Sequence, residues 1–172
     1  PFLLPPPVLA HFRQALAQGA KAEADWDARW RAYTDAFPDL AAELQGRLRG
    51  DLPAGWDADI PVFDADDKGM ATRVAGGRVM NAIASQLPAL FGGSADLDPS
   101  THTALKAQGT FNPLPRRGDD LQGRDAGGWN RSGRNLHFGV REHAMGAIVN
   151  GLAAHGGFLP FGSTFFIFSD YM

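Results

Sequence analysis

The chain has 172 residues, of which 44% are hydrophobic, so it can form one ordinary domain, or parts of two, around a real apolar core. Its net charge of −3 argues against a nucleic-acid protein held by phosphate contacts. The absence of cysteine excludes disulfides and thiolate metal sites. We find no signal peptide and no apolar run long enough to span a bilayer, and we therefore expect a cytoplasmic protein without a membrane partner.

Residues 8–50 have helical spacing. The first apolar face follows prolines suited to a helix start and consists of Val8, Phe12 and Leu16. Gly19 is a possible break. Aromatic residues then recur at spacings of four, three and four, which predicts one stripe made of Trp26, Trp30, Tyr33 and Phe37. We expect this stripe to pack against another domain rather than to bind a ligand. A second helix is predicted from Pro38, with Gly50 as its terminating residue.

Residues 51–70 are rich in proline, glycine and aspartate, which predicts a linker. From Thr72 the pattern becomes α/β, beginning with a helical face that ends near Pro88. The expected elements that follow are a strand at Leu90–Leu97, a long loop at 107–134, a strand at Leu136–Val140, a helix at Glu142–Ala154 and a strand at Phe158–Phe161. The loop alternates arginines with Asp119, Asp120 and Asp125, which indicates a solvated surface. The last strand, helix and strand predict parallel pairing with a right-handed crossover.

Glu142 stands in the first turn of the last predicted helix. A glutamate there is often a surface residue favoured by the helix dipole. This helix, however, is apolar around nearly its whole circumference, which predicts burial. Glu142 is therefore expected at the buried end of a sheet, where strand ends and helix starts converge on ligands. A carboxylate in such a place needs a specific polar partner, which indicates a buried cofactor site.

Other chemistries are less well supported by the sequence. His143 and His137 do not have the spacing of a known zinc site, so structural roles are expected. Ser94 lacks the nucleophile-elbow pattern of a hydrolase, and no phosphate loop or GxGxxG is present. Phe165, Phe168 and Tyr171 recur every three residues, so they share a face if helical. They could be ordinary core, or they could clamp a flat heterocycle beside the carboxylate.

Several segments together resemble the transketolase family. They are HFGVREHAMGAIVNGLAAHGG, GGSADLDPS and MATR, supported upstream by PPPVLAHFRQAL and LPAGWDADIPVF. The resemblance covers essentially the whole chain, in the family's order. It implies a fragment: residues 1–68 would be the helical tail of the diphosphate-binding domain with the linker, and residues 69–172 the first part of the parallel-sheet pyrimidine-binding domain. The remainder of the protein is expected to lie outside this chain.

The resemblance also implies site residues. The glutamate of REHAMG is Glu142, which in the family hydrogen-bonds N1′ of the thiamine aminopyrimidine. The aspartate of GGSADL is Asp96, near the cofactor at the subunit boundary. The ring pocket around the pyrimidine matches three positions, Phe165, Phe168 and Tyr171. Arg73 of MATR and Ser100 of DPS are expected to hold a sugar phosphate, for which arginine suits through its planar fork of donors.

The activity implied is transfer of a two-carbon ketol unit from a ketose phosphate to an aldose phosphate through a thiamine diphosphate carbanion. The pKa of Glu142 is expected to be raised by desolvation, so that it shares a proton with N1′. Mg2+ is implied as a second cofactor, with its ligands outside this chain, and a homodimer with its active site between subunits is expected. The fragment alone should be inactive. Loop 107–134 is longer than the family pattern, which leaves its role open.

Two alternatives remain at this stage. One is a related thiamine diphosphate enzyme, such as a deoxyxylulose phosphate synthase or a 2-oxoacid dehydrogenase component. The sequences of the REHAMG and GGSADL motifs disfavour this alternative. The other is a non-catalytic interaction module that retains the fold. Assays that compare sugar phosphates with pyruvate as substrates distinguish a transketolase from the related enzymes. A thermal shift on adding thiamine diphosphate distinguishes an enzyme from the non-catalytic module.

Overall fold

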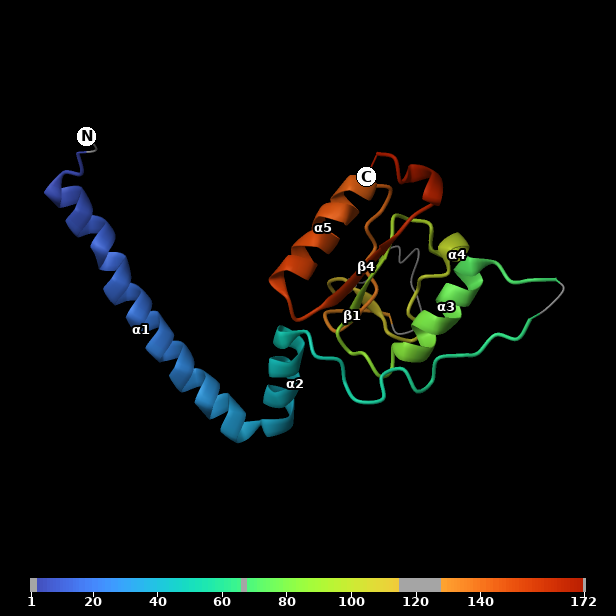
Figure 1. Cartoon of the computed structure of the whole chain (residues 1–172), viewed down its shortest axis with the longest axis horizontal. Coiled ribbons are helices and arrows are strands. Elements are labelled where there is room, and N and C mark those ends of the chain that lie inside the picture. The colour runs from blue at the N-terminus through green and yellow to red at the C-terminus, as the bar shows by residue number, and fades with distance from the viewer. Residues whose placement is uncertain (1–2, 66–67, 115–127, 172) are drawn as a thin grey trace. The chain divides into compact units, whose positions relative to one another are not determined.

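The computed structural model describes residues 3–65, 68–114 and 128–171 (Figure 1). The chain divides into two compact units, Pro1–Gln45 and Gly46–Met172. The elements in chain order are α1 (Pro6–Ala36), α2 (Pro38–Arg49), α3 (Thr72–Ile83), β1 (Leu90–Ser94), α4 (Asp98–Thr101), β2 (Thr110–Phe111), β3 (Trp129–Asn130), α5 (Glu142–His155), β4 (Leu159–Ser163) and the 3-10 turn η1 (Phe166–Phe168). None of the helices in the described part of the chain combines the length and apolarity that a membrane span requires.

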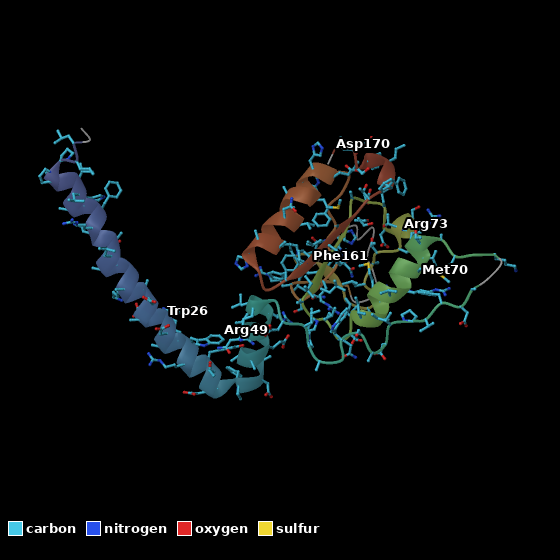
Figure 2. All side chains as sticks on the ribbon, viewed as in Figure 1. Trp26, Arg49, Met70, Arg73, Phe161 and Asp170 are labelled. Atoms are coloured by element: carbon cyan, nitrogen blue, oxygen red, sulfur yellow. The ribbon has the colours of Figure 1, made fainter. Side chains whose placement is uncertain are left out.

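The first unit is dominated by α1, which is a continuous helix of 31 residues. The possible break at Gly19 is wrong, because one glycine costs only about 1 kcal/mol within a long helix. The predicted aromatic stripe is confirmed, with ring centroids 6.3 Å apart for Trp26–Trp30, 5.9 Å for Trp30–Tyr33 and 5.4 Å for Tyr33–Phe37. Trp26, marked in Figure 2, remains 59% exposed. Its packing against another domain stays a prediction.

The second unit has the predicted helix and parallel-strand architecture. β1 and β4 pair in parallel, with Ser94 opposite Ser163 at their carboxyl ends. The two strands approach closely at Gly92, where a Cβ atom would overlap the carbonyl oxygen of Phe161. α5 precedes β4 and packs against it. The α/β fold class is therefore confirmed, and residues 51–70 contain no helix or strand within their described part, as a linker requires.

The partner of β4 differs from the prediction. The expected strand at Leu136–Val140 is wrong, because only Asn135 forms isolated bridges, to Gly92 and to Thr110. Asn135 is 3% exposed, and its side chain bonds to the backbone of Leu105 and Gly109, which holds this segment in an irregular path. Beyond it the backbone turns at Gly139, whose φ is +66°. The parallel partner of β4 is consequently the earlier strand β1.

The core of this unit lies beneath the carboxyl ends of the two strands. Ala95, Phe138 and Met145 form a buried cluster, with Leu136 and Val149 packed against it. Met145 is the one buried residue of α5, and Ile148 is 46% exposed. The prediction that α5 is buried all round is therefore wrong for this chain, because the elements present cover only one face of the helix.

The long loop 107–134 contains the short parallel pair of β2 and β3. Residues 115–127 lie outside the described residues, and with them the predicted charges at Asp119, Asp120 and Asp125. On the described side, the guanidinium of Arg134 donates to the carbonyl oxygens of Leu87 at 2.8 Å and Ala84 at 2.7 Å. Arg134 thus ties the loop to the end of α3. Burial first, and the Arg47 guanidinium second, lower the pKa of Arg134.

Candidate functional site at the carboxyl edge of the sheet

Three segments reach the same edge of the second unit. Because β1 and β4 are parallel, the residues after Ser94 and after Ser163 emerge side by side, and the amide of Ala95 donates to the carbonyl of Ser163 at 3.0 Å. α5 runs into β4 through a short connection, so the first turn of α5 lies at the carboxyl end of β4. Ala95 packs against Met145, one turn after Glu142. This is where α/β sheets bind ligands.

Glu142 begins α5, with Arg141 as the preceding cap residue. Its side chain is half-buried. Within the part of the chain that the structure describes, the Glu142 carboxylate accepts no hydrogen bond. It is nevertheless close enough to influence Tyr171: partial desolvation first, and the Glu142 charge second, raise the pKa of the Tyr171 phenol. Among the described residues, Glu142 is therefore an acceptor without a hydrogen-bond donor, one residue before His143, whose ring packs against Tyr171.

The predicted ring cluster is assembled in the segment that follows β4. Phe165 and Phe168 are stacked with centroids 6.1 Å apart, and Phe168 and Tyr171 are tilted at 5.6 Å. The helical turn within this segment is the 3-10 turn η1, which lies between Phe165 and Tyr171. Thr164, just before the cluster, has a buried hydroxyl without a hydrogen-bond partner among the described residues. Among the described residues, the cluster thus combines partly exposed rings, Phe165 at 38% and Tyr171 at 50%, with a hydroxyl that has no partner.

Asp96 follows β1 in a left-handed backbone conformation, with φ of +64°. Such a conformation is uncommon for a residue with a side chain, and it concentrates at functional sites. Asp96 is exposed and lines a cavity of about 440 Å³. The wall of this cavity also includes Asp98, Asn135, His137 and Arg141. The carboxylate of Asp98 accepts a hydrogen bond from the backbone amide of Ala104 and so fixes the loop that follows α4.

Arg73 and Ser100 lie on two other elements, the helices α3 and α4. Arg73 is exposed in the first turn of α3, and Figure 2 shows its position on that helix. Ser100 is half-buried in α4, which packs against α3. The contact is close, because a Cβ at Gly77 would overlap the carbonyl of His102. Neither Arg73 nor Ser100 is among the described residues that line the 440 Å³ cavity.

The sequence did not single out all the wall residues. Asp98, Asn135 and Arg141 were missed, and His137 was expected to be structural. His137 lines the cavity and lies 3.4 Å from the hydroxyl of Thr110. Asp98 and Arg141 stand beside the motif residues Asp96 and Glu142, and this adjacency is the signal that could have found them. Asn135 left no such signal, because its burial follows from tertiary packing alone.

The edge therefore has the parts of a cofactor site in an α/β domain: a carboxylate that accepts no hydrogen bond from the described residues, a cluster of aromatic rings and a polar cavity. Comparisons with known proteins define the class. Residues 1–53 match the model of the transketolase thiamine diphosphate binding domain, and residues 68–172 match that of the transketolase pyrimidine binding domain. The chain belongs to the transketolase family.

Individual relatives agree with this assignment. The chain is 48% identical over 172 residues to a transketolase of Geobacillus stearothermophilus, which covers 99% of the chain and 23% of the relative. A transketolase structure from Pichia stipitis in complex with sedoheptulose 7-phosphate has a TM-score of 0.82 and 39% identity, over 98% of the chain and 24% of that structure. A Leishmania mexicana transketolase structure has a TM-score of 0.80 and 36% identity, over 98% and 23%. The chain thus spans about a quarter of the length of its relatives.

Proposed function

We propose that this chain is part of a transketolase, which transfers a two-carbon ketol unit from a ketose phosphate to an aldose phosphate with thiamine diphosphate as cofactor. The observation that carries the proposal is the half-buried Glu142 carboxylate, which accepts no hydrogen bond from the described residues and whose charge helps to raise the pKa of the Tyr171 phenol. Membership of the transketolase family supports the same reading.

The residues at the edge fit an aminopyrimidine. The ring cluster of Phe165, Phe168 and Tyr171 would offer apolar faces to a flat heterocycle. Glu142 would meet a ring nitrogen and hold a proton between its carboxylate and that nitrogen. Closure of this edge by the rest of the protein would desolvate the Glu142 carboxylate, which favours a proton shared with the ring nitrogen. Asp96 would contribute from the strained turn after β1. When bound, thiamine diphosphate supplies the carbon nucleophile that carries the two-carbon unit.

The proposal includes a magnesium ion, which the diphosphate would require. Among the described residues, no group of three His, Asp or Glu side chains could hold a metal ion. We therefore assign the magnesium ligands to the part of the protein outside this chain. By the same reasoning we infer that the fragment is inactive by itself, because the described residues offer no binding group for the metal.

Sugar phosphates are the proposed substrates. The Pichia stipitis relatives were crystallised with xylulose 5-phosphate and sedoheptulose 7-phosphate, according to the descriptions of those structures. Arg73 and Ser100, on the adjacent helices α3 and α4, would hold the phosphate of such a sugar. We further infer a cytoplasmic homodimer with its active site between subunits, and no nucleic-acid or membrane partner. The exposed apolar side of α5, with Ile148 at 46%, supports a covered interface.

The test uses the complete protein that contains this chain. Glu142→Gln keeps the size of the side chain and removes its charge, so the transfer rate from xylulose phosphate to ribose phosphate should fall by roughly two orders of magnitude, the scale of general acid–base contributions. Glu23→Gln, on the exposed surface of α1, is the control and should retain the rate. Near-full activity of Glu142→Gln would remove Glu142 from its role.

Two further measurements separate the alternatives. Turnover of pyruvate in place of the sugar phosphates would favour another thiamine diphosphate enzyme. Saturating thiamine diphosphate with magnesium should raise the melting temperature of the complete protein, because a ligand that binds only the folded state stabilises it. The absence of any shift would favour a module without catalysis.

A further inference from the structure

The aromatic segment, defined as Thr164–Tyr171, is only lightly held by its packing. Phe166 is 91% exposed and Ile167 79%, and none of the segment belongs to the buried core cluster. Its internal hydrogen bonds are short turns, such as the Phe168 amide to the Phe165 carbonyl at 3.0 Å. These turns shape the segment but do not fix its place. A contact with another element of the chain is therefore needed to locate the three rings relative to Glu142.

The segment returns to the helix that carries Glu142. Figure 1 shows the chain leaving β4 through η1 and curling back, so that its C-terminal end lies at the start of α5. There the Nε2 atom of His143 bonds to the backbone carbonyl of Tyr171. The imidazole also packs edge-on against the Tyr171 ring, with centroids 5.4 Å apart and planes at 63°. Among the described residues, this is the one hydrogen bond between the aromatic segment and α5.

The donor and acceptor of this hydrogen bond can be assigned. A carbonyl oxygen only accepts, so Nε2 of His143 must carry the proton and donate it. Either the neutral Nε2–H tautomer or the imidazolium satisfies this requirement, and a glutamine side chain could also supply a donor. A phenylalanine at the same position would keep the ring contact and lose the bond. The two contributions of His143 can therefore be separated by substitution.

We propose that His143 is a positioning residue: by bonding to the Tyr171 carbonyl it fastens the aromatic segment to the first turn of α5 and sets the distance between the ring cluster and Glu142. The proposal rests on the proposed function, because the segment is taken to bind the aminopyrimidine of thiamine diphosphate. His143 itself need not touch the cofactor. Its loss should weaken cofactor binding, since the segment would have to be ordered again each time the cofactor binds.

The experiment compares three variants of the complete protein. His143→Phe should raise the Kd for thiamine diphosphate about tenfold, the effect of losing roughly one hydrogen bond, while kcat at saturating cofactor stays within about twofold. His143→Gln should restore most of the affinity. The matched control is His155→Phe at the opposite end of α5, where the histidine is exposed and its one hydrogen bond among the described residues is with the neighbouring Gly156 carbonyl. It should leave Kd unchanged.

A second measurement does not depend on cofactor or activity. In the cofactor-free protein, amide hydrogen exchange of Phe165–Tyr171 should be faster in His143→Phe than in the wild type, with exchange of the β1 and β4 amides unchanged. Unchanged exchange in the aromatic segment, an unchanged Kd, or equal Kd values for the Phe and Gln variants would each overturn the role of His143. A wild-type protein that does not bind thiamine diphosphate would overturn the proposed function instead.

Discussion

Asn135 gives the sharpest test of how the cavity wall is held. It is 3% exposed, and its side chain accepts from the Leu105 amide at 2.8 Å and donates to the carbonyls of Leu105 and Gly109 at 2.9 Å each. In Asn135→Ala the two carbonyls keep other donors, because Gln108 still bonds to Leu105 and the Asn135 amide to Gly109. The Leu105 amide has no other acceptor among the described residues, and Leu105 is 0% exposed.

The magnitude follows from this inventory. The orphaned amide costs about 1–3 kcal/mol, and the two lost donor bonds add roughly 0.5 kcal/mol each because their acceptors are still satisfied. We expect a loss of about 3 kcal/mol in the free energy of unfolding, measured by urea denaturation of the protein with tryptophan fluorescence. Asn150→Ala, exposed on α5, is the control and should change stability by less than about 0.5 kcal/mol. A loss below about 1 kcal/mol for Asn135→Ala would refute the reasoning.

The other predictions concern the same edge. Gly93→Ala should destabilise the protein by about 2 kcal/mol or more, because its Cβ would overlap the backbone carbonyl of Leu136, whereas Gly76→Ala in α3 meets nothing and should be neutral or slightly stabilising in the same denaturation assay. Glu142→Gln should lower the pKa of the Tyr171 phenol, followed by NMR of labelled tyrosine with Tyr171→Phe as assignment; an unchanged pKa would mean that the two side chains do not interact. The pKa of Tyr171 is higher in the folded state than in the unfolded state, so its contribution to the free energy of unfolding is present below the ordinary tyrosine pKa and is lost as the pH rises through the folded value. Tyr171→Phe should therefore reduce the loss of stability at alkaline pH.

The sequence predicted well wherever spacing and local chemistry decide the structure. The stripe from Trp26 to Phe37 and the helix starts at Pro38 and Glu142 follow from period and from favoured terminal residues. The ring cluster was predicted from a three-residue repeat, and neighbouring rings do meet, one pair stacked and the other tilted. In each case the residues that meet are close in the chain, so no tertiary information was needed.

Prediction failed where distant segments compete. Residues 136–140 have the apolar pattern of a strand, but the buried side chain of Asn135 holds the backbone to Leu105 and Gly109, thirty and twenty-six residues away. β4 consequently pairs with β1 instead. The burial of α5 failed for another reason. Its apolar circumference is real, yet only the face with Met145 meets an element of this chain, and a helix that is apolar all round needs partners on every side.

That second failure bears on the site itself. The same absence of covering elements leaves Glu142 half-buried and Tyr171 50% exposed, although a shared proton requires a desolvated carboxylate. This chain thus holds the residues that bind the aminopyrimidine in the proposed function, but not the covering elements that would desolvate them. A surface that covers α5 would complete both together: it would bury Ile148 and exclude water from the first turn. Cofactor affinity and association of this face should therefore be coupled, and each should strengthen the other by the same factor.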